Sequence, residues 1–150
     1  MYKYELNKIF KVTLKNISFD NIPTHKLIKL FKDGRHASHV LELWIETNFE
    51  GIKKIDVKDH DFTDGEDNYM EAKNFTKHGA DFNPSRMKGV GRKYIKEEAD
   101  KVIKSNIYVI IDINDMPTIT LKFVEGSKLL EKYPNGKIPL KLRDEFFSDN

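Results

Sequence analysis

The chain has 150 residues, of which 39% are hydrophobic and 33% are charged, and its formal net charge is only +2. This length, with ten Phe, six Tyr and one Trp, predicts one domain over residues 1–150 with a buried core, and it excludes a wholly disordered chain. The sequence has no Cys, which excludes disulfides, thiolate zinc sites, iron–sulfur clusters and cysteine nucleophiles, so any metal ion must be bound by oxygen or imidazole ligands.

The amino-terminal third predicts one strand and two helices. Residues 10–15 alternate between apolar and polar side chains, which is the two-residue period of a half-buried strand. A helical pattern begins after residues 21–24, is interrupted at Asp33-Gly34, and resumes over residues 37–49. The second helix carries a wide apolar arc and a narrow polar strip.

Residues 52–62 and 69–75 predict the two arms of a β-hairpin. Between them stands Asp64-Gly65, a dipeptide that favours hairpin turns. We expect the hairpin to close through a three-residue loop centred on Glu66.

The second half of the chain predicts one helix and two strands. Residues 87–103 place apolar side chains at helical spacing, with basic side chains outside. Residues 107–113 are almost continuously apolar, which is typical of an interior strand, and residues 118–124 alternate. Residues 133–136 predict a turn, and residues 143–147 predict a last helical turn.

The expected hairpin would bring two carboxylates and an ammonium group together on one face. Glu71 and Lys73 are two residues apart, so their side chains share one side of a strand. In the expected register Asp61 lies opposite Glu71, and Asp59 lies opposite Lys73. Asp61 and Glu71 would then hold Mg²⁺ against a scissile phosphate, while Lys73 orients or helps deprotonate the attacking water.

Other acidic side chains are candidates for the same site. Glu42 and Glu46 lie one helical turn apart on the preceding helix, and either could complete the metal site or hold Lys73. Asp59 competes with Asp61 as a metal ligand. The alternative is that Asp61, Glu71 and Lys73 form only an exposed ladder of cross-strand salt bridges, worth less than about 1 kcal/mol. For Glu42 and Glu46 the alternative is that they lie on the solvated side of the helix.

The charges are unevenly placed along the chain. Residues 42–71 contain ten acidic and three basic side chains, whereas residues 77–104 contain eight basic and four acidic ones. An acidic segment followed by a basic one is typical of a protein that holds hard cations beside a polyanion. Ordinary solvated surface is the alternative interpretation.

The acidic helix followed by Asp61 and then Glu71-Ala72-Lys73 resembles the PD-(D/E)xK nuclease superfamily, in particular its type II restriction enzymes. The matching helix position is Glu46 or Glu42, and the resemblance covers roughly residues 35–125. It implies a restriction-endonuclease-like α/β fold, with a mixed central sheet flanked by helices. It also implies DNA cleavage that depends on Mg²⁺, with Mn²⁺ as a substitute.

This sequence departs from the superfamily pattern at three places. No proline precedes Asp61, and Asp59 stands two residues before it. Asp56-Val57-Lys58 is a second acidic-x-Lys triplet. We prefer Glu71-Ala72-Lys73, because no strand-borne acid lies upstream of Asp56 at hairpin distance.

Double-stranded DNA is the expected partner. A homodimer is expected as well, because one active site per chain must cut two strands. Site-specific restriction, a phage or mobile-element endonuclease, and structure-directed repair or junction cleavage all fit; a non-catalytic nucleic-acid-binding module is the alternative. The candidates for phosphate contacts are the basic residues that follow the catalytic strand, unless they are only a solvated face: Lys77, Arg86, Lys88, Arg92 and Lys93.

The sequence also bears on the location of the protein. No apolar run reaches the roughly 18 residues that a membrane span needs. Residues 1–11 lack the continuous apolar stretch of a secretory signal. We therefore expect a cytoplasmic protein without a membrane partner.

Overall fold

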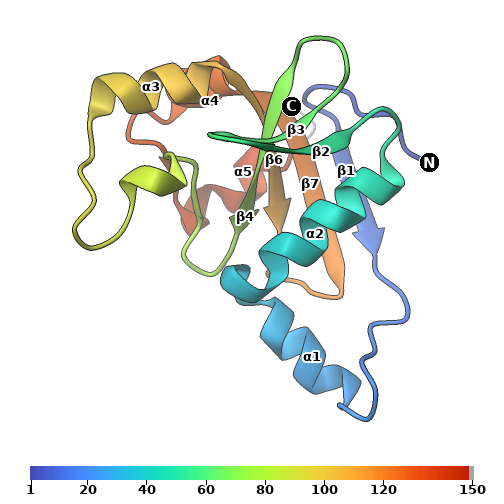
Figure 1. The fold of residues 1–150 in the computed structure, drawn as a ribbon. Coiled ribbons are helices and arrows are strands. Elements are labelled where there is room, and N and C mark those ends of the chain that lie inside the picture. Colours follow the sequence, from blue (N-terminus) through green and yellow to red (C-terminus); the bar gives the residue numbers. More distant parts are fainter. Residues whose placement is uncertain (149–150) are drawn as a thin grey trace.

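The computed structural model describes residues 1–148 and contains a mixed six-stranded sheet with helices on both faces (Figure 1). The α/β class expected from the sequence is therefore confirmed. Only β4 and β6 are parallel, whereas all other neighbouring strands are antiparallel. From edge to edge the strands are β1 (Ile9–Thr13), β7 (Thr118–Glu125), β6 (Asn106–Asp112), β4 (Tyr69–Phe75), β3 (His60–Thr63) and β2 (Lys53–Val57).

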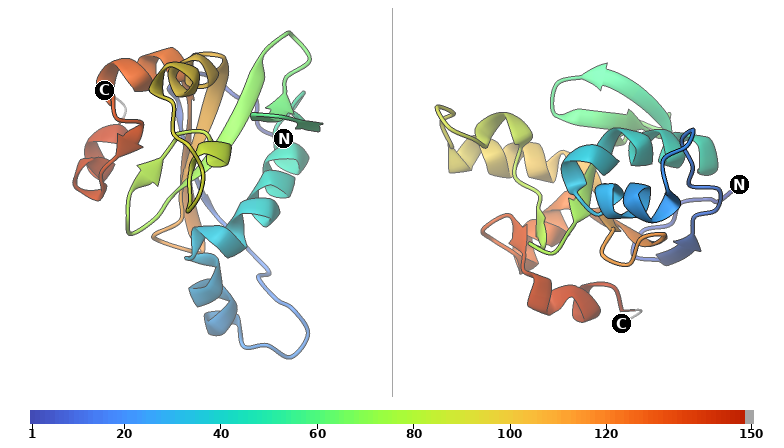
Figure 2. Two further views of the ribbon diagram at one scale, coloured as in Figure 1. Left: turned by 60° about the vertical axis from the view of Figure 1, so that its left-hand side comes forward. Right: turned by 90° about the horizontal axis from the view of Figure 1, so that it is seen from below.

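Helices lie on both sides of this sheet (Figure 2). One face is covered by α2 (Gly34–Asn48), with α1 (Thr24–Phe31) packed at its amino-terminal end. Among residues 1–148, no helix is long and apolar enough to cross a membrane. The other face carries α3 (Lys96–Lys104), α4 (Gly126–Lys132) and α5 (Arg143–Phe146), the 3₁₀ turns η1 (Ser85–Met87) and η2 (Leu140–Leu142), and a small sheet of β5 (Ala80–Asp81) and β8 (Lys137–Ile138).

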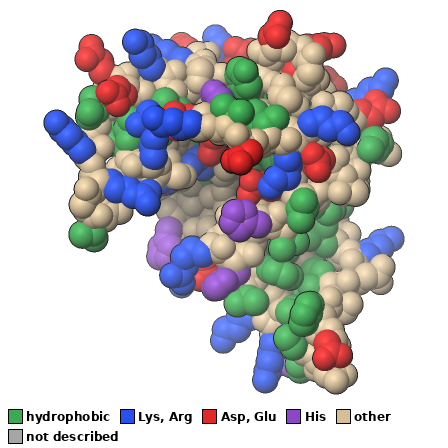
Figure 3. All heavy atoms as spheres, viewed as in Figure 1, with side chains coloured by type: hydrophobic (Ala, Val, Ile, Leu, Met, Phe, Trp, Pro, Cys, Tyr) green, Lys and Arg blue, Asp and Glu red, His purple; other side chains and the backbone are tan. Residues whose placement is uncertain are grey.

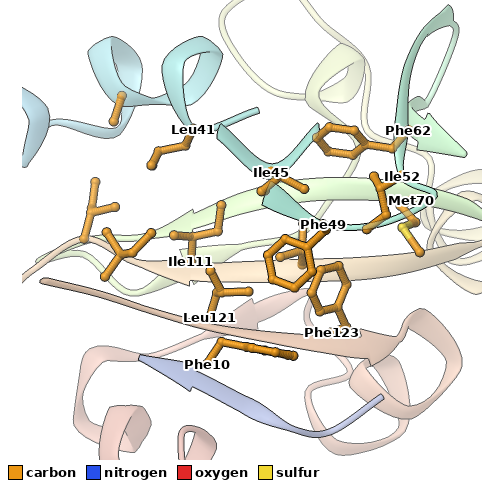
Figure 4. Packing of buried hydrophobic residues seen from close by; sticks show 14 of the residues in the cluster. Phe10, Leu41, Ile45, Phe49, Ile52, Phe62, Met70, Ile111, Leu121 and Phe123 are labelled. Carbon is orange, nitrogen blue, oxygen red and sulfur yellow. The ribbon is translucent and has the colours of Figure 1, made fainter. Parts of the chain in front are cut away.

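The core under α2 explains why this helix lies where it does. Leu41 and Ile45 are four residues apart, so they form one buried stripe that lies over the sheet (Figure 4). The ring of Phe49, just after the helix, lies 5.1 Å from the rings of both Phe10 and Phe123. This packing fixes α2 against β1 and β7.

The strands predicted over residues 10–15, 107–113 and 118–124 are confirmed as β1, β6 and β7. The strand β6 lies between β4 and β7 and is covered by helices on both faces. Its burial on both faces accounts for its almost continuous apolar sequence.

The register of the predicted hairpin is confirmed, although its loop is longer than expected. Phe62 pairs with Met70, which centres the loop on Glu66. The loop has five residues, from Asp64 to Asn68, rather than three. The longer loop is stabilised by the Asp64 carboxylate, which accepts hydrogen bonds from the backbone N–H groups of Glu66 (2.8 Å) and Asn68 (3.3 Å).

The first arm of the hairpin is two strands rather than the single strand predicted over residues 52–62. The chain reverses between β2 and β3 at a tight turn in which Asp59 has a φ of 67°. Aspartate tolerates this left-handed conformation better than most residues do. Since Asp59 lies in a turn and the β3–β4 ladder ends before it, the expected position of Asp59 opposite Lys73 is wrong.

The helix predicted over residues 87–103 is wrong in its first half. Only α3 is helical, and residues 88–95 form an irregular segment after η1. Gly89 and Gly91 adopt φ values of 103° and 79°, which are incompatible with a right-handed helix. Val90, which the helical pattern counted as an apolar position, is fully exposed.

Candidate active site

The candidate site lies in a fork where β3 separates from β4. The ladder between these strands ends at the Phe62–Met70 pair. Beyond it, the Oδ2 atom of Asp61 accepts a hydrogen bond from the backbone N–H of Ala72 at 2.9 Å. The Asp61 side chain thus takes the place of the next backbone partner and is held beside Glu71.

Lys73 is held at the same place by polar contacts on three sides. Its Nζ donates to the Ser85 hydroxyl at 3.0 Å and to the Asn83 carbonyl at 3.3 Å, and it lies 3.8 Å from Oε1 of Glu71. The Lys73 side chain is only 9% exposed and the Glu71 side chain 15%. The predicted grouping of Glu71 and Lys73 on one side of β4 is therefore present, in a buried rather than solvated form.

Burial and mutual repulsion set the charge state of the carboxylates. Burial, reinforced by the nearby Asp61 carboxylate, raises the pKa of Glu71 to about 8, although the Lys73 ammonium acts in the opposite direction. Burial and the same Asp61 charge also raise the pKa of Glu42. The Lys54 ammonium partly offsets this rise. Ionising these carboxylates together is therefore costly, and a cation beside them would lower that cost.

The two helix glutamates have different surroundings. Glu42 lines the same cleft as Asp61, and one of its oxygens lies 3.5 Å from Nζ of Lys54. Glu46 instead accepts a hydrogen bond from the backbone N–H of Lys54 at 2.6 Å, and it fixes the start of β2 to α2. Of the two, Glu42 is the one that the fold brings to the fork.

Asp59 lies near the fork but has a partner of its own. Its carboxylate accepts two hydrogen bonds from Nε of Arg86, at 2.9 and 3.2 Å. It lines a small pocket of about 170 Å³ next to Asp61 and Lys73. The ion pair with Arg86 joins the β2–β3 turn to η1, the turn that also contains Ser85.

An open cleft of about 1060 Å³ leads to the fork. Glu42, Asp61, Glu71 and Lys73 lie along it, as does Ser85. Figure 3 shows this hollow with Lys and Arg side chains on both sides and His side chains at its lower edge. The cleft is large enough to admit more than a water molecule or an ion to the carboxylates.

The donor set suits a hard divalent cation. Among residues 1–148, no three acidic or histidine side chains form a closed metal cage. A Mg²⁺ ion does not need one, because it is commonly held by one or two carboxylates together with waters and phosphate oxygens. Asp61 and Glu71 are the two carboxylates that could hold such an ion, and Glu42 lies along the same cleft.

The five basic residues predicted to contact phosphate have three kinds of surroundings. Lys77 and Lys88 line the cleft, and burial reinforced by the Lys73 charge lowers the pKa of Lys88. Arg86 is engaged by Asp59, and Arg92 donates to the Ser85 carbonyl at 2.8 Å. The fifth, Lys93, lies exposed in the irregular segment before α3.

Several residues that line or support the cleft were not predicted from the sequence. Lys29 of α1 and Lys32, the residue that follows α1, line the cleft, although both precede the acidic helix in the chain. A signal was present, because residues 21–32 contain three lysines and no acidic residue. Asn83 and Ser85, which hold Lys73, had no signal in the sequence apart from their place in a loop.

No protein-family model matches the chain, and neither the curated proteins nor the solved structures contain a match to it. The chemistry of the cleft must therefore be inferred from its own residues. Those residues offer clustered carboxylates and a largely buried ammonium group along one open cleft. Lys88 is paired there with Asp81 at 3.7 Å, whereas Lys29, Lys32 and Lys77 form no ion pair within residues 1–148.

Proposed function

We propose that the chain is a Mg²⁺-dependent endodeoxyribonuclease that hydrolyses DNA phosphodiester bonds at the fork of β3 and β4. The observation that carries this proposal is the convergence of Asp61, Glu71 and Lys73 at the bottom of an open cleft. The element order supports a restriction-endonuclease-like fold, since an acidic helix precedes the β2–β3–β4 meander and α3 leads into the parallel strand β6.

Asp61 and Glu71 are the proposed metal ligands, with Glu42 assisting. When bound, a divalent cation neutralises phosphate charge and lowers the pKa of a bound water. The hydrogen bond from the Ala72 backbone N–H orients Oδ2 of Asp61 at the fork. Burial of Glu71 beside Asp61 makes an uncompensated carboxylate pair costly, so the fork favours a cation.

Lys73 orients the attacking water or stabilises charge on the phosphate in the transition state. Its ammonium group has three N–H donors, of which Ser85 and Asn83 engage two. One donor thus remains for the water or the phosphate. Because the side chain is nearly buried, this donor is held in place before substrate arrives.

Lys77 and Lys88 line the same cleft and are the proposed contacts to phosphates next to the scissile bond. Cleavage of a duplex by one site per chain requires either two copies or successive nicks. We propose a homodimer, whose symmetry would match that of a symmetric DNA site. Site-specific restriction or phage and mobile-element cleavage would use this arrangement, and a junction or repair nuclease would use it on structured DNA.

The test is incubation of supercoiled plasmid and linear mixed-sequence DNA with the protein, in Mg²⁺, Mn²⁺ or chelator. We expect metal-dependent cleavage that Lys73→Ala abolishes while DNA affinity stays nearly unchanged. The matched control is Lys11→Ala, which removes an exposed lysine from the edge strand β1. Discrete fragments would indicate site-specific cleavage, and nicking without bands would indicate a structure-directed or nonspecific enzyme.

A folded sample that leaves every DNA intact with both metals would overturn the nuclease proposal. Cleavage that survives Lys73→Ala would overturn the role given to Lys73. If DNA binding persists without cleavage in any metal, the cleft belongs to a non-catalytic binding module.

A further inference from the structure

Helix α1 has the composition of a phosphate-binding surface. Residues 21–32 contain Lys26, Lys29 and Lys32 and no acidic residue. Leu27 is buried, whereas the lysines are exposed. Within residues 1–148, neither Lys29 nor Lys32 forms an ion pair with an acidic side chain. Their charge is therefore not neutralised by the protein.

The fold brings this charge to the same cleft as the carboxylates. Lys29 and Lys32 line the cleft together with Asp61, Glu71 and Lys73. Figures 1 and 2 place α1 and the start of α2 on one side of the end of β4, with η1 and residues 88–95 on the other. The cleft thus has basic residues on two sides that come from segments about fifty residues apart.

The α1 side is fixed to the catalytic strand. Asn74, which follows Lys73 on β4, donates to the Gly34 carbonyl and to the Ser38 hydroxyl, both at 3.1 Å. Gly34 lies so close to β4 that an added Cβ would stand 3.2 Å from the Thr76 methyl group. The amino-terminal end of α2, on which α1 packs, is therefore held at a set position relative to Lys73.

We propose that Lys29 and Lys32 form a second phosphate-binding surface, called here the α1 surface, which contacts the DNA backbone across the cleft from Lys88. The proposal rests on the proposed function, since it assigns the DNA path over that same site. The argument is charge complementarity with the DNA phosphates. Lys29 and Lys32 line one side of the cleft without an acidic partner, and Lys88 lines the other side next to the fork. The sequence had assigned phosphate contacts only to residues after β4.

The test is DNA binding by the full chain in chelator, where no cleavage occurs, with a short fluorescent duplex of mixed sequence. The variant is Lys29→Ala/Lys32→Ala. The matched control is Lys101→Ala/Lys104→Ala, which removes two exposed lysines with the same three-residue spacing from α3. We expect the first variant to bind about tenfold or more weakly, and its salt dependence to lose a slope of about 2, one unit per phosphate contact. The control should stay within about twofold of the wild type.

The outcomes separate this proposal from the nuclease proposal. If the wild type cleaves DNA but the α1 variant keeps its affinity and salt slope, the α1 surface is refuted and the nuclease stands. An equal loss in the α3 control would refute it too, because net charge would then explain the effect. If the α1 variant alone loses DNA affinity and the wild type cleaves nothing, the α1 surface stands and the nuclease proposal fails. Tighter binding of a matched RNA duplex would overturn DNA as the occupant.

Discussion

Replacing Glu71 with Gln should stabilise the metal-free protein at pH 8 and change its stability little at pH 5. In the native chain, burial together with the Asp61 carboxylate raises the pKa of Glu71 from 4.5 to about 8. The folded chain therefore keeps a proton on Glu71 at neutral pH that the unfolded chain has released. A Gln side chain does not ionise, so the stability of the variant lacks the pH dependence that Glu71 causes.

The sign and size of the effect follow from that shift in pKa. Because the folded state binds the extra proton, the wild-type contribution is fully present below pH 4.5 and is lost as the pH rises through 8. At roughly 1.4 kcal/mol per unit, the free energy of unfolding should fall by about 3 kcal/mol between pH 5 and pH 8. For a domain of this length, that is a fall in melting temperature of roughly 6–12 °C.

The assay is thermal unfolding in chelator from pH 5 to pH 8, followed by circular dichroism. At each pH the melting temperature of Glu71→Gln is compared with that of the wild type. The other titrating groups are the same in both proteins, so their effects cancel in the difference. Glu131→Gln, at an exposed position on α4, is the control and should follow the wild type. If the melting temperatures of wild type and Glu71→Gln change with pH in the same way, Glu71 is not a carboxylate whose pKa is raised by burial and by Asp61.

Three further predictions concern the same fold. Mg²⁺ at about 100 times its dissociation constant should stabilise the wild type by about 3 kcal/mol in thermal unfolding, and Asp61→Asn should lose most of that gain; an equal gain in both would place the ion elsewhere. Ser85→Ala should lower the cleavage rate about tenfold with DNA affinity unchanged, because Lys73 loses a 3.0 Å partner; an unchanged rate would show that Ser85 does not position Lys73. Gly126→Ala should cost about 2 kcal/mol or more in urea unfolding, because its Cβ would collide with the Ile103 carbonyl, whereas the exposed Ser127→Ala should cost little.

Local patterns predicted the part of the site that depends on local geometry. The alternation of β3 and β4 around one turn fixed their register, so Asp61 and Glu71 could be placed together from the sequence. A strand repeats every two residues, so Lys73 had to follow Glu71 on the same side. These relations span no more than twelve residues, and a sequence pattern can specify them.

The rest depends on contacts between distant residues. The ion pair of Asp59 with Arg86 joins positions 27 residues apart, and it depends on the left-handed turn at Asp59. The helical spacing of residues 87–103 was a true periodicity in the sequence, but Gly89 and Gly91 turn the backbone out of the helical region. The apolar pattern shows which side chains suit burial, whereas backbone conformation decides whether the pattern forms a helix.

The choice between Glu42 and Glu46 shows why side chains at helical spacing are hard to assign. Four residues apart, both lie on the same side of α2 and differ only in position along the helix axis. The strand β2 returns beside the carboxyl-terminal half of α2, so the backbone N–H of Lys54 takes Glu46 as its acceptor. Glu42, one turn nearer the start of the helix, lines the cleft at the fork, where burial and then the Asp61 charge raise its pKa. Which glutamate lies at the fork is thus decided by where β2 begins, a property of the segment that joins α2 to β2 rather than of the helix itself.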